Sequence, residues 1–246
     1  MKILIHHIPK CAGTALANQF KNTFGLGLYR FLDPSAIVDT IGEVAPSEQL
    51  NTLLNCPSIK NAQYKPCIDV NDVINTDNIV LYAHKFQGGV NSLLNDPTWI
   101  KVTSFRNPFE RFFSSYVQRQ RNKKEHLYVG SDDMYQFYFF YKEWISGTPL
   151  ELNDETAPAI LEMAISMLDC FDIIFDKKTL FADIKTAFGV TELVNSNRNN
   201  DNKTSMETSL TFPYNIAMEY CKYVAYDYEF YMHAAAKRPT ALYQHR

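Results

Sequence analysis

Short apolar runs alternate along this chain with longer segments whose apolar residues recur at helical spacing. The short runs predict strands at residues 2–7, 79–83, 99–105 and 172–175. The longer segments predict helices at residues 14–24, 108–121, 134–145, 156–167, 180–188 and 214–236. Strands that alternate with helices in this way indicate the α/β class, with a mainly parallel sheet flanked by helices on both faces.

The chain has 246 residues, which suits one domain with a full core, so we predict a single domain over residues 1–246. Residues 33–78 are rich in Pro, Asn, Asp and Ser and interrupt the alternation, which predicts an insertion of loops and short helices. Residues 195–209 are polar and nearly free of apolar side chains, as is typical of a loop.

The residues that follow the first predicted strand concentrate groups that bind anions. Residues 6–14 read His-His-Ile-Pro-Lys-Cys-Ala-Gly-Thr, and a helix is predicted to begin near Gly13 or Thr14. Backbone N–H groups at a helix start, the positive end of the helix dipole, the Lys10 ammonium and the Thr14 hydroxyl then converge on one point. The triphosphate-binding pattern G-x-x-x-x-G-K-[ST] is absent, because the lysine precedes the glycine. The loop therefore predicts a site for a phosphate-like or sulfate-like group without Mg²⁺.

A second block, residues 101–116, predicts a strand that leads directly into a helix. Asn107 has the character of an N-cap, a proline follows at the first helical position, and Glu110 lies three residues after the cap. Arg106 at the strand end and Ser114 on the helix can grip one phosphate together, the arginine through a bidentate charge-assisted bond. We therefore expect a second anion site at this junction.

Helical spacing divides the side chains of the second block into two faces. The polar face is predicted to carry Arg111, Ser114 and Gln118, and the packing face Phe109, Phe112, Phe113 and Tyr116. Arg111 is interpreted either as a ligand-binding residue or as the partner of a carboxylate. A basic cluster follows, read as a solvated helix end or as a contact for an anionic polysaccharide: Arg119, Arg121, Lys123 and Lys124.

P-K-C-A-G-T after an N-terminal strand, followed by R-N-P-x-x-R-x-x-S-x-Y, resembles the sulfotransferases that use 3′-phosphoadenosine 5′-phosphosulfate (PAPS). More narrowly, it is similar to the carbohydrate branch that includes the uronyl 2-O-sulfotransferases. The resemblance implies a P-loop-like sulfotransferase fold and a PAPS-dependent O-sulfotransferase. Such an enzyme moves the sulfuryl group of PAPS, by in-line displacement, to a hydroxyl of a carbohydrate-type acceptor such as a glycan. PAPS is then the co-substrate, adenosine 3′,5′-bisphosphate the product, and no metal is expected.

The resemblance also implies roles for individual residues. Lys10 is expected to act in catalysis, and Arg106 and Ser114 to hold the 3′-phosphate. The 5′-phosphosulfate is expected to bind the loop Pro9, Lys10, Cys11, Ala12, Gly13, Thr14 and Ala15. Residues 81–86 resemble a G-H-x-x-F segment, although Ala83 replaces its glycine, and this match makes His84 the expected general base. His7 is the next candidate.

Two further segments take meaning from the resemblance. Residues 33–78 are expected to shape the acceptor cleft, and residues 195–209 either cover PAPS or form a surface loop without that role. Residues 224–231 resemble a helix near the family's C-terminus. Two rival hypotheses stay open: a P-loop-like kinase or nucleotide hydrolase, and a non-catalytic nucleotide-binding module.

Charge and composition narrow the class of partner. The net charge of −3 provides no general field for nucleic acid or an anionic membrane. No apolar run is long enough to span a bilayer, and the N-terminus lacks a signal-peptide pattern, so we predict a cytoplasmic protein without a membrane span. The five cysteines have no metal-type spacing and are predicted to be reduced thiols. Cys11 lies near a lysine and a helix start, which predicts a lowered pKa.

The aromatic run between residues 135 and 144 has two interpretations. Its rings are expected either to form a helix buried in the core, which we favour, or to stack on sugar rings. The run contains Tyr135, Phe137, Tyr138, Phe139, Phe140, Tyr141 and Trp144.

Overall fold

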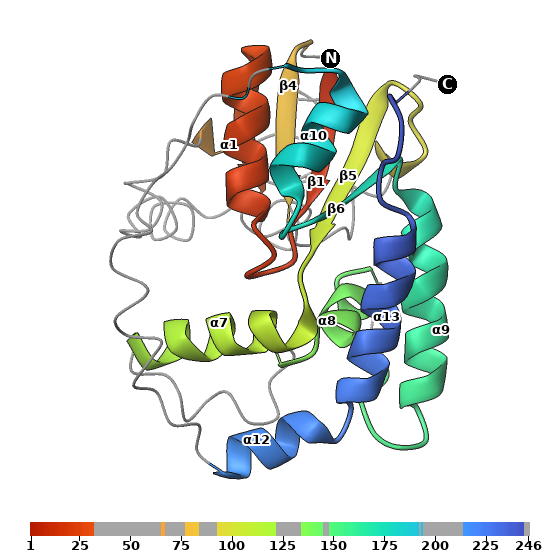
Figure 1. The fold of residues 1–246 in the computed structure, drawn as a ribbon. Coiled ribbons are helices and arrows are strands. Elements are labelled where there is room, and N and C mark those ends of the chain that lie inside the picture. The colour runs from red at the N-terminus through yellow and green to blue at the C-terminus, as the bar shows by residue number, and fades with distance from the viewer. Residues whose placement is uncertain are drawn as a thin grey trace, which may run out of the picture.

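The structure is a computed structural model that describes residues 1–31, 65–66, 77–83, 93–121, 134–144, 148–191, 193 and 214–243. Within these residues a parallel sheet stands at the centre and helices lie on both of its faces (Figure 1). The predicted α/β class with a mainly parallel sheet is therefore confirmed.

The described residues form a six-stranded sheet in the order β3-β2-β4-β1-β5-β6, and every pairing is parallel. Its strands are β1 (Lys2–His6), β2 (Gly27–Phe31), β3 (Lys65–Pro66), β4 (Ile79–Ala83), β5 (Trp99–Phe105) and β6 (Ile173–Asp176). At the end of β1, His6 pairs with Ala83 of β4 and with Thr103 of β5. The carboxyl ends of these three strands therefore meet at one edge of the sheet.

Two apolar clusters hold the helices against the sheet. The helices are α1 (Gly13–Phe24), α7 (Pro108–Arg121), α8 (Gln136–Lys142), α9 (Ala157–Met167), a 3₁₀ turn η3 (Leu168–Cys170), α10 (Leu180–Phe188), α12 (Tyr214–Cys221) and α13 (Val224–Ala236). One cluster joins α1 and α10 to one sheet face, and the other joins α7, α8, α9, α12 and α13 around the opposite face and the carboxyl edge. Figure 1 shows α7 running across the carboxyl ends of the strands.

The structure contains strands that the apolar pattern did not predict. Residues 27–31 form β2, whose register Gly27↔Ile79 places it beside β4. Its sequence Gly-Leu-Tyr-Arg-Phe is not a continuous apolar run, and in the sheet it pairs with β4. Residues 33–78 lie outside the described residues, except for β3 and residues 77–78.

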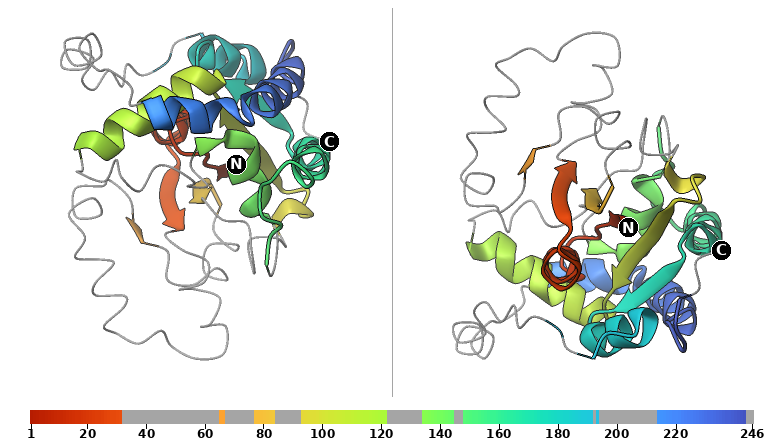
Figure 2. Two further views of the ribbon diagram at one scale, coloured as in Figure 1. Left: turned by 90° about the horizontal axis from the view of Figure 1, so that it is seen from below. Right: turned by 90° about the horizontal axis from the view of Figure 1, so that it is seen from above.

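The helix predicted at 214–236 is two helices, separated at Lys222 and Tyr223. The two helices pack against different parts of the protein. Tyr220 of α12 stacks on Phe112 of α7 with ring centroids 4.0 Å apart, whereas Phe230 of α13 packs on Phe105 of β5 at 5.1 Å. Figure 2 shows α12 beside α7 in the view from below. One straight helix cannot meet both surfaces, so the chain turns.

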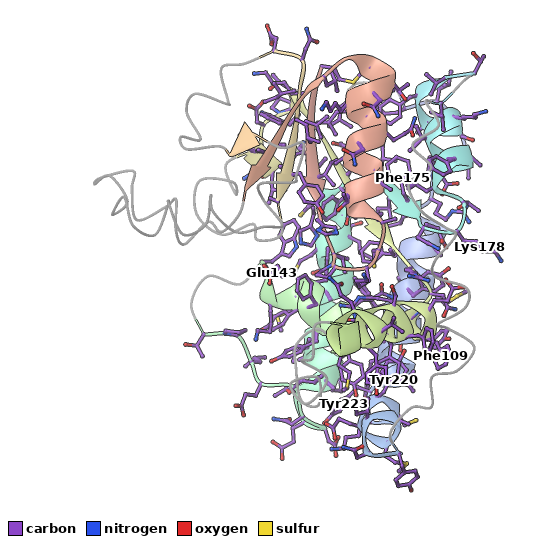
Figure 3. All side chains as sticks on the ribbon, turned by 90° about the vertical axis from the view of Figure 1, so that its left-hand side faces the viewer. Phe109, Glu143, Phe175, Lys178, Tyr220 and Tyr223 are labelled. Carbon is purple, nitrogen blue, oxygen red and sulfur yellow. The ribbon has the colours of Figure 1, made fainter. Side chains whose placement is uncertain are left out.

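The faces of α7 also differ from the prediction. Arg111 is completely buried beside Phe112 and Tyr116, while Phe109 is 53% exposed. The buried face is centred between residues 111 and 116 because α7 lies over α12, and Tyr220 occupies the space below it (Figure 3). The aromatic run of α8 is buried in the core, which confirms the favoured interpretation.

Candidate functional site

The loop between β1 and α1 emerges at the carboxyl edge of the sheet and lies between the sheet and α7 (Figures 1 and 3). The His7 N–H donates to the Ala83 carbonyl at 2.7 Å, which extends the pairing of β1 with β4 by one bond. The Thr103 hydroxyl donates to the His6 carbonyl at 3.2 Å from the other side. Both neighbouring strands thus hold the start of the loop.

Two residues of this loop have a left-handed backbone conformation. Lys10 and Ala12 both have φ of 69°, in the left-handed region, and they flank Cys11. A non-glycine residue in this region is uncommon, and left-handed residues occur in the backbone turns that aim N–H groups at an anion. Ala12 is also the N-cap of α1 and makes no side-chain capping bond. Left-handed residues and a helix start without a side-chain cap are compatible with an anion-binding loop, and anion binding here stays a prediction.

The imidazole ring of His7 lies so close to residue 13 that only glycine fits there. A Cβ added at this position would lie 2.1 Å from Cδ2 of His7, closer than any real contact. The His7 ring stacks on Tyr82 with centroids 4.6 Å apart, and its Nδ1 lies 2.5 Å from the Tyr82 hydroxyl. That hydroxyl is 3.0 Å from Oγ1 of Thr14. A hydrogen-bonded chain thus runs from His7 through Tyr82 to the threonine of the loop.

Arg106 follows β5 at the same edge. Asn107 caps α7 as predicted, because its Oδ1 accepts the Glu110 N–H at 3.3 Å. Nε of Arg106 donates to Oε2 of Glu110 at 3.1 Å, an ion pair between residues one helical turn apart. Guanidinium carries five N–H donors, and this bond uses one. Ser114 is partly exposed on α7, two helical turns further along the chain.

A buried glutamine links the two segments that are predicted to bind anions. Gln136, at the start of α8, accepts from Sγ of Cys11 at 3.6 Å and donates to the Arg106 carbonyl at 3.0 Å. The Ser104 hydroxyl donates to the Cys11 carbonyl at 2.7 Å. Sequence reasoning missed Gln136 and Ser104. The signal for Gln136 was its position as a single amide within an aromatic run.

The Cys11 side chain faces the core, not the loop opening. It is completely buried among the aromatic side chains around α8, and this burial raises the pKa of its thiol to about 12, against the lowering effect of Arg111 and Arg106. The predicted lowering of the Cys11 pKa is therefore wrong, because desolvation of the thiolate outweighs the nearby positive charges.

The pKa of Cys11 predicts how the native protein reacts with a thiol reagent. Iodoacetamide at neutral pH should modify the exposed Cys221 and leave Cys11 unmodified, because Cys11 is inaccessible and almost entirely protonated. Peptide mass spectrometry measures both sites, and the urea-unfolded chain, in which both should react, is the control. Equal modification of the two cysteines in the native state would contradict this placement.

The histidines near the site have different environments. His6 is completely buried, and its ring lies against Phe140 with centroids 5.1 Å apart, so it belongs to the core. His7 is partly exposed beside the loop. His84 lies outside the described residues, and the residue before it, Ala83, ends β4 at the site edge. Its role as a general base stays a prediction.

Arg111 lies in the interior of the protein. It is completely buried, and its guanidinium donates to the Met134 carbonyl at 3.3 Å. Burial raises the pKa of Asp227 to about 6, and the Arg111 charge opposes this rise. The two interpretations of Arg111 therefore stay open, although its charge does act on the Asp227 carboxyl. The side chains of the basic cluster at 119–124 and all of residues 195–209 lie outside the described residues.

The described residues contain neither a metal-binding cluster nor a membrane-spanning helix. Over those ranges, no group of three or more His, Cys, Asp or Glu side chains is arranged to hold a metal ion. None of the helices in the same part of the chain has the length and apolar character needed to cross a membrane.

Comparison with known proteins bears on the family to which the chain belongs. No curated protein sequence shows a significant match to the chain. A family model described as "Sulfotransferase family" matches residues 1–224, a range that contains both predicted anion-binding segments and every strand of the described sheet. The chain therefore belongs to the sulfotransferase family.

Proposed function

We propose that this sulfotransferase uses PAPS as its donor and transfers the sulfuryl group to a hydroxyl of a carbohydrate-type acceptor. One observation carries the proposal. The anion-binding loop and Arg106 lie at adjacent strand ends and are linked through Gln136. Two anion sites at a constant separation suit a donor with negative charge at both its 5′ and its 3′ end. The carbohydrate acceptor rests on the resemblance to the uronyl 2-O-sulfotransferases.

The residues present fit this donor. The loop 9–15 would hold the 5′-phosphosulfate through its backbone N–H groups and Lys10, and Arg106 with Ser114 would hold the 3′-phosphate. When bound, PAPS supplies the sulfuryl group and a phosphate leaving group. Lys10 and the loop N–H groups are suited to stabilise the charge that develops on that phosphate. His84 is the proposed acceptor of the hydroxyl proton.

Thermal unfolding separates this proposal from its rivals. A ligand that binds only the native state raises the melting temperature, so adenosine 3′,5′-bisphosphate should stabilise the protein and Mg-ATP should not. Transfer from labelled PAPS should then be measured with glycan, lipid-linked and phenolic acceptors. Stabilisation by Mg-ATP alone would favour a kinase or nucleotide hydrolase. Binding of PAPS without transfer to any of these acceptors would favour a binding module.

Replacing Arg106 with alanine should weaken binding of adenosine 3′,5′-bisphosphate by ~1.5–3 kcal/mol, the value of a hydrogen bond to a charged group. Isothermal titration calorimetry measures the loss. Glu110→Gln is the matched control, because it removes the negative charge beside Arg106 and keeps the guanidinium. Unchanged binding by the Arg106→Ala protein, or an equal loss in the Glu110→Gln protein, would contradict the assignment.

Sulfuryl transfer should continue in the presence of EDTA. In nucleotide-triphosphate enzymes Mg²⁺ bridges the β- and γ-phosphates, and PAPS has no such pair. Initial rates with labelled PAPS should be equal with EDTA and with added Mg²⁺. Complete loss of transfer in EDTA, restored by Mg²⁺, would favour the kinase-like rival.

A further inference from the structure

Gln136 is a polar side chain in a place where the sequence is otherwise aromatic. It is completely buried at the start of α8, and the five residues that follow it are aromatic and buried. Burying an amide is unfavourable unless its polar atoms are hydrogen-bonded. Both ends of Gln136 are bonded, one to Cys11 and one to Arg106. The residue therefore joins two segments that are 95 positions apart in the sequence.

The chemistry of the two partners determines which way the amide points. The Arg106 carbonyl can only accept, so the NH₂ group of Gln136 must face it. The carbonyl end of the amide then faces the Cys11 thiol. Because burial raises the pKa of Cys11 to about 12, the thiol keeps its proton and can donate. The two bonds are mutually consistent.

The bonds close a ring that includes both anion-binding segments. Ser104 donates to the Cys11 carbonyl, the Cys11 thiol donates to Gln136, and Gln136 donates to the Arg106 carbonyl, two residues after Ser104 on the same chain. Ser104, Cys11 and Gln136 are all completely buried. Cys11 is thus held at its backbone and at its side chain, and Lys10 is its direct neighbour.

The start of α8 is itself anchored. Oδ1 of Asp227, on α13, accepts the Phe137 N–H at 2.9 Å, at a helix whose own N-cap residue Tyr135 makes no side-chain capping bond. The carboxylate of Asp227 also lies at the positive end of the α8 dipole, where negative charge is stabilising. Gln136 is therefore presented from a helix terminus whose position α13 controls.

We infer that Gln136 is a positioning residue that couples the two anion sites, by holding the loop around Cys11 at a constant distance from Arg106. The inference rests on the proposed function, in which these sites bind the two ends of one PAPS molecule. A ligand with both phosphates benefits from correct spacing, whereas a ligand with one phosphate does not. Loss of Gln136 should therefore reduce the advantage of carrying both phosphates.

The test compares adenosine 3′,5′-bisphosphate with adenosine 5′-phosphate and adenosine 3′-phosphate by calorimetry. The ratio of each monophosphate Kd to the bisphosphate Kd measures the advantage of the second phosphate. In Gln136→Met, which keeps the side-chain length, we expect both ratios to fall roughly 3- to 10-fold, the effect of losing a hydrogen bond. Monophosphate affinities should change little.

Gln19→Met is the matched control. Gln19 is also completely buried, but it lies within α1 and donates to Thr23 in the same helix. The Gln19→Met protein should be less stable than the native protein, with no change in the two Kd ratios. Cys11→Ala provides a second variant that breaks only the thiol side of the bridge. It should show a smaller fall in the same direction, and the double variant should lose no more than Gln136→Met alone.

Three outcomes would overturn the inference. If the Kd ratios of Gln136→Met and Cys11→Ala equal those of the native protein, the bridge does not couple the sites. An equal fall in Gln19→Met would show a general effect of destabilisation. If the native protein binds adenosine 3′,5′-bisphosphate no more tightly than the monophosphates, the proposed function fails and the inference fails with it. In the first two outcomes the native protein still prefers the bisphosphate, so the proposed function survives.

Discussion

Replacing Lys10 with alanine should slow sulfuryl transfer by roughly 10²–10³-fold, the usual effect of removing a group that stabilises developing charge. Affinity for adenosine 3′,5′-bisphosphate should change far less. The reason is that the Lys10 charge matters most when the leaving phosphate gains negative charge, and only interactions that strengthen in the transition state accelerate the reaction. The left-handed backbone at residue 10 is equally accessible to alanine and lysine, so the loop conformation should be kept.

Single-turnover transfer from labelled PAPS measures the rate for Lys10→Ala, and calorimetry measures the affinity. Lys185→Ala is the control, because Lys185 is exposed in the last turn of α10, away from the carboxyl edge of the sheet. Equal losses in rate and affinity would mean that Lys10 only binds the donor. A full rate in the Lys10→Ala protein would remove Lys10 from the mechanism.

Replacing His84 with alanine should slow transfer by ~10²–10⁴-fold and leave the nucleotide complex intact, because a positioned general base contributes this much. In the native enzyme the rate should also fall as the pH drops through the pKa of the base, since imidazolium cannot accept the acceptor's proton. A pH–rate profile with labelled PAPS and a fixed acceptor measures this fall in rate at acidic pH. The fall should disappear in the His84→Ala protein.

His7→Ala is the informative comparison for His84. His7 contacts Gly13 and bonds Tyr82, so its loss should disturb the loop and weaken nucleotide binding as well as transfer. A base acts differently, because its loss affects transfer alone. If His84→Ala keeps the full rate while His7→Ala loses the acidic limb of the profile, the base is His7 and the match at residues 81–86 is a coincidence.

Much of the fold was predictable because parallel strands buried on both faces appear in sequence as short apolar runs. The strands at 2–6, 79–83 and 99–105 were predicted within a residue, and the Asn107 cap was evident from its spacing to Glu110. Strand β2 was not predictable in this way, because its sequence Gly-Leu-Tyr-Arg-Phe includes a glycine and an arginine and is not a continuous apolar run.

The anion-binding loop was also a local property. Its lysine, its glycine and the start of α1 lie within a few residues of each other, so the sequence alone predicted an anion-binding loop, and the structure has left-handed residues at Lys10 and Ala12 just before α1. Arg106 was predicted for the same reason, since it stands between a strand end and a helix cap. Local chemistry at a strand-to-helix junction depends on neighbours in the chain, and these are visible in the sequence.

Long-range packing decided the rest. The pKa of Cys11 rises because α8 covers its thiol, which local charges alone would have lowered. Arg111 turns inward toward the region of Asp227, which lies more than a hundred residues later in the chain. Gln136 bridges Cys11 and Arg106 only after three separate segments have packed together. The sequence by itself predicted which groups bind anions; the tertiary structure decided how those groups are spaced, because burial and distance arise only when remote segments share one core.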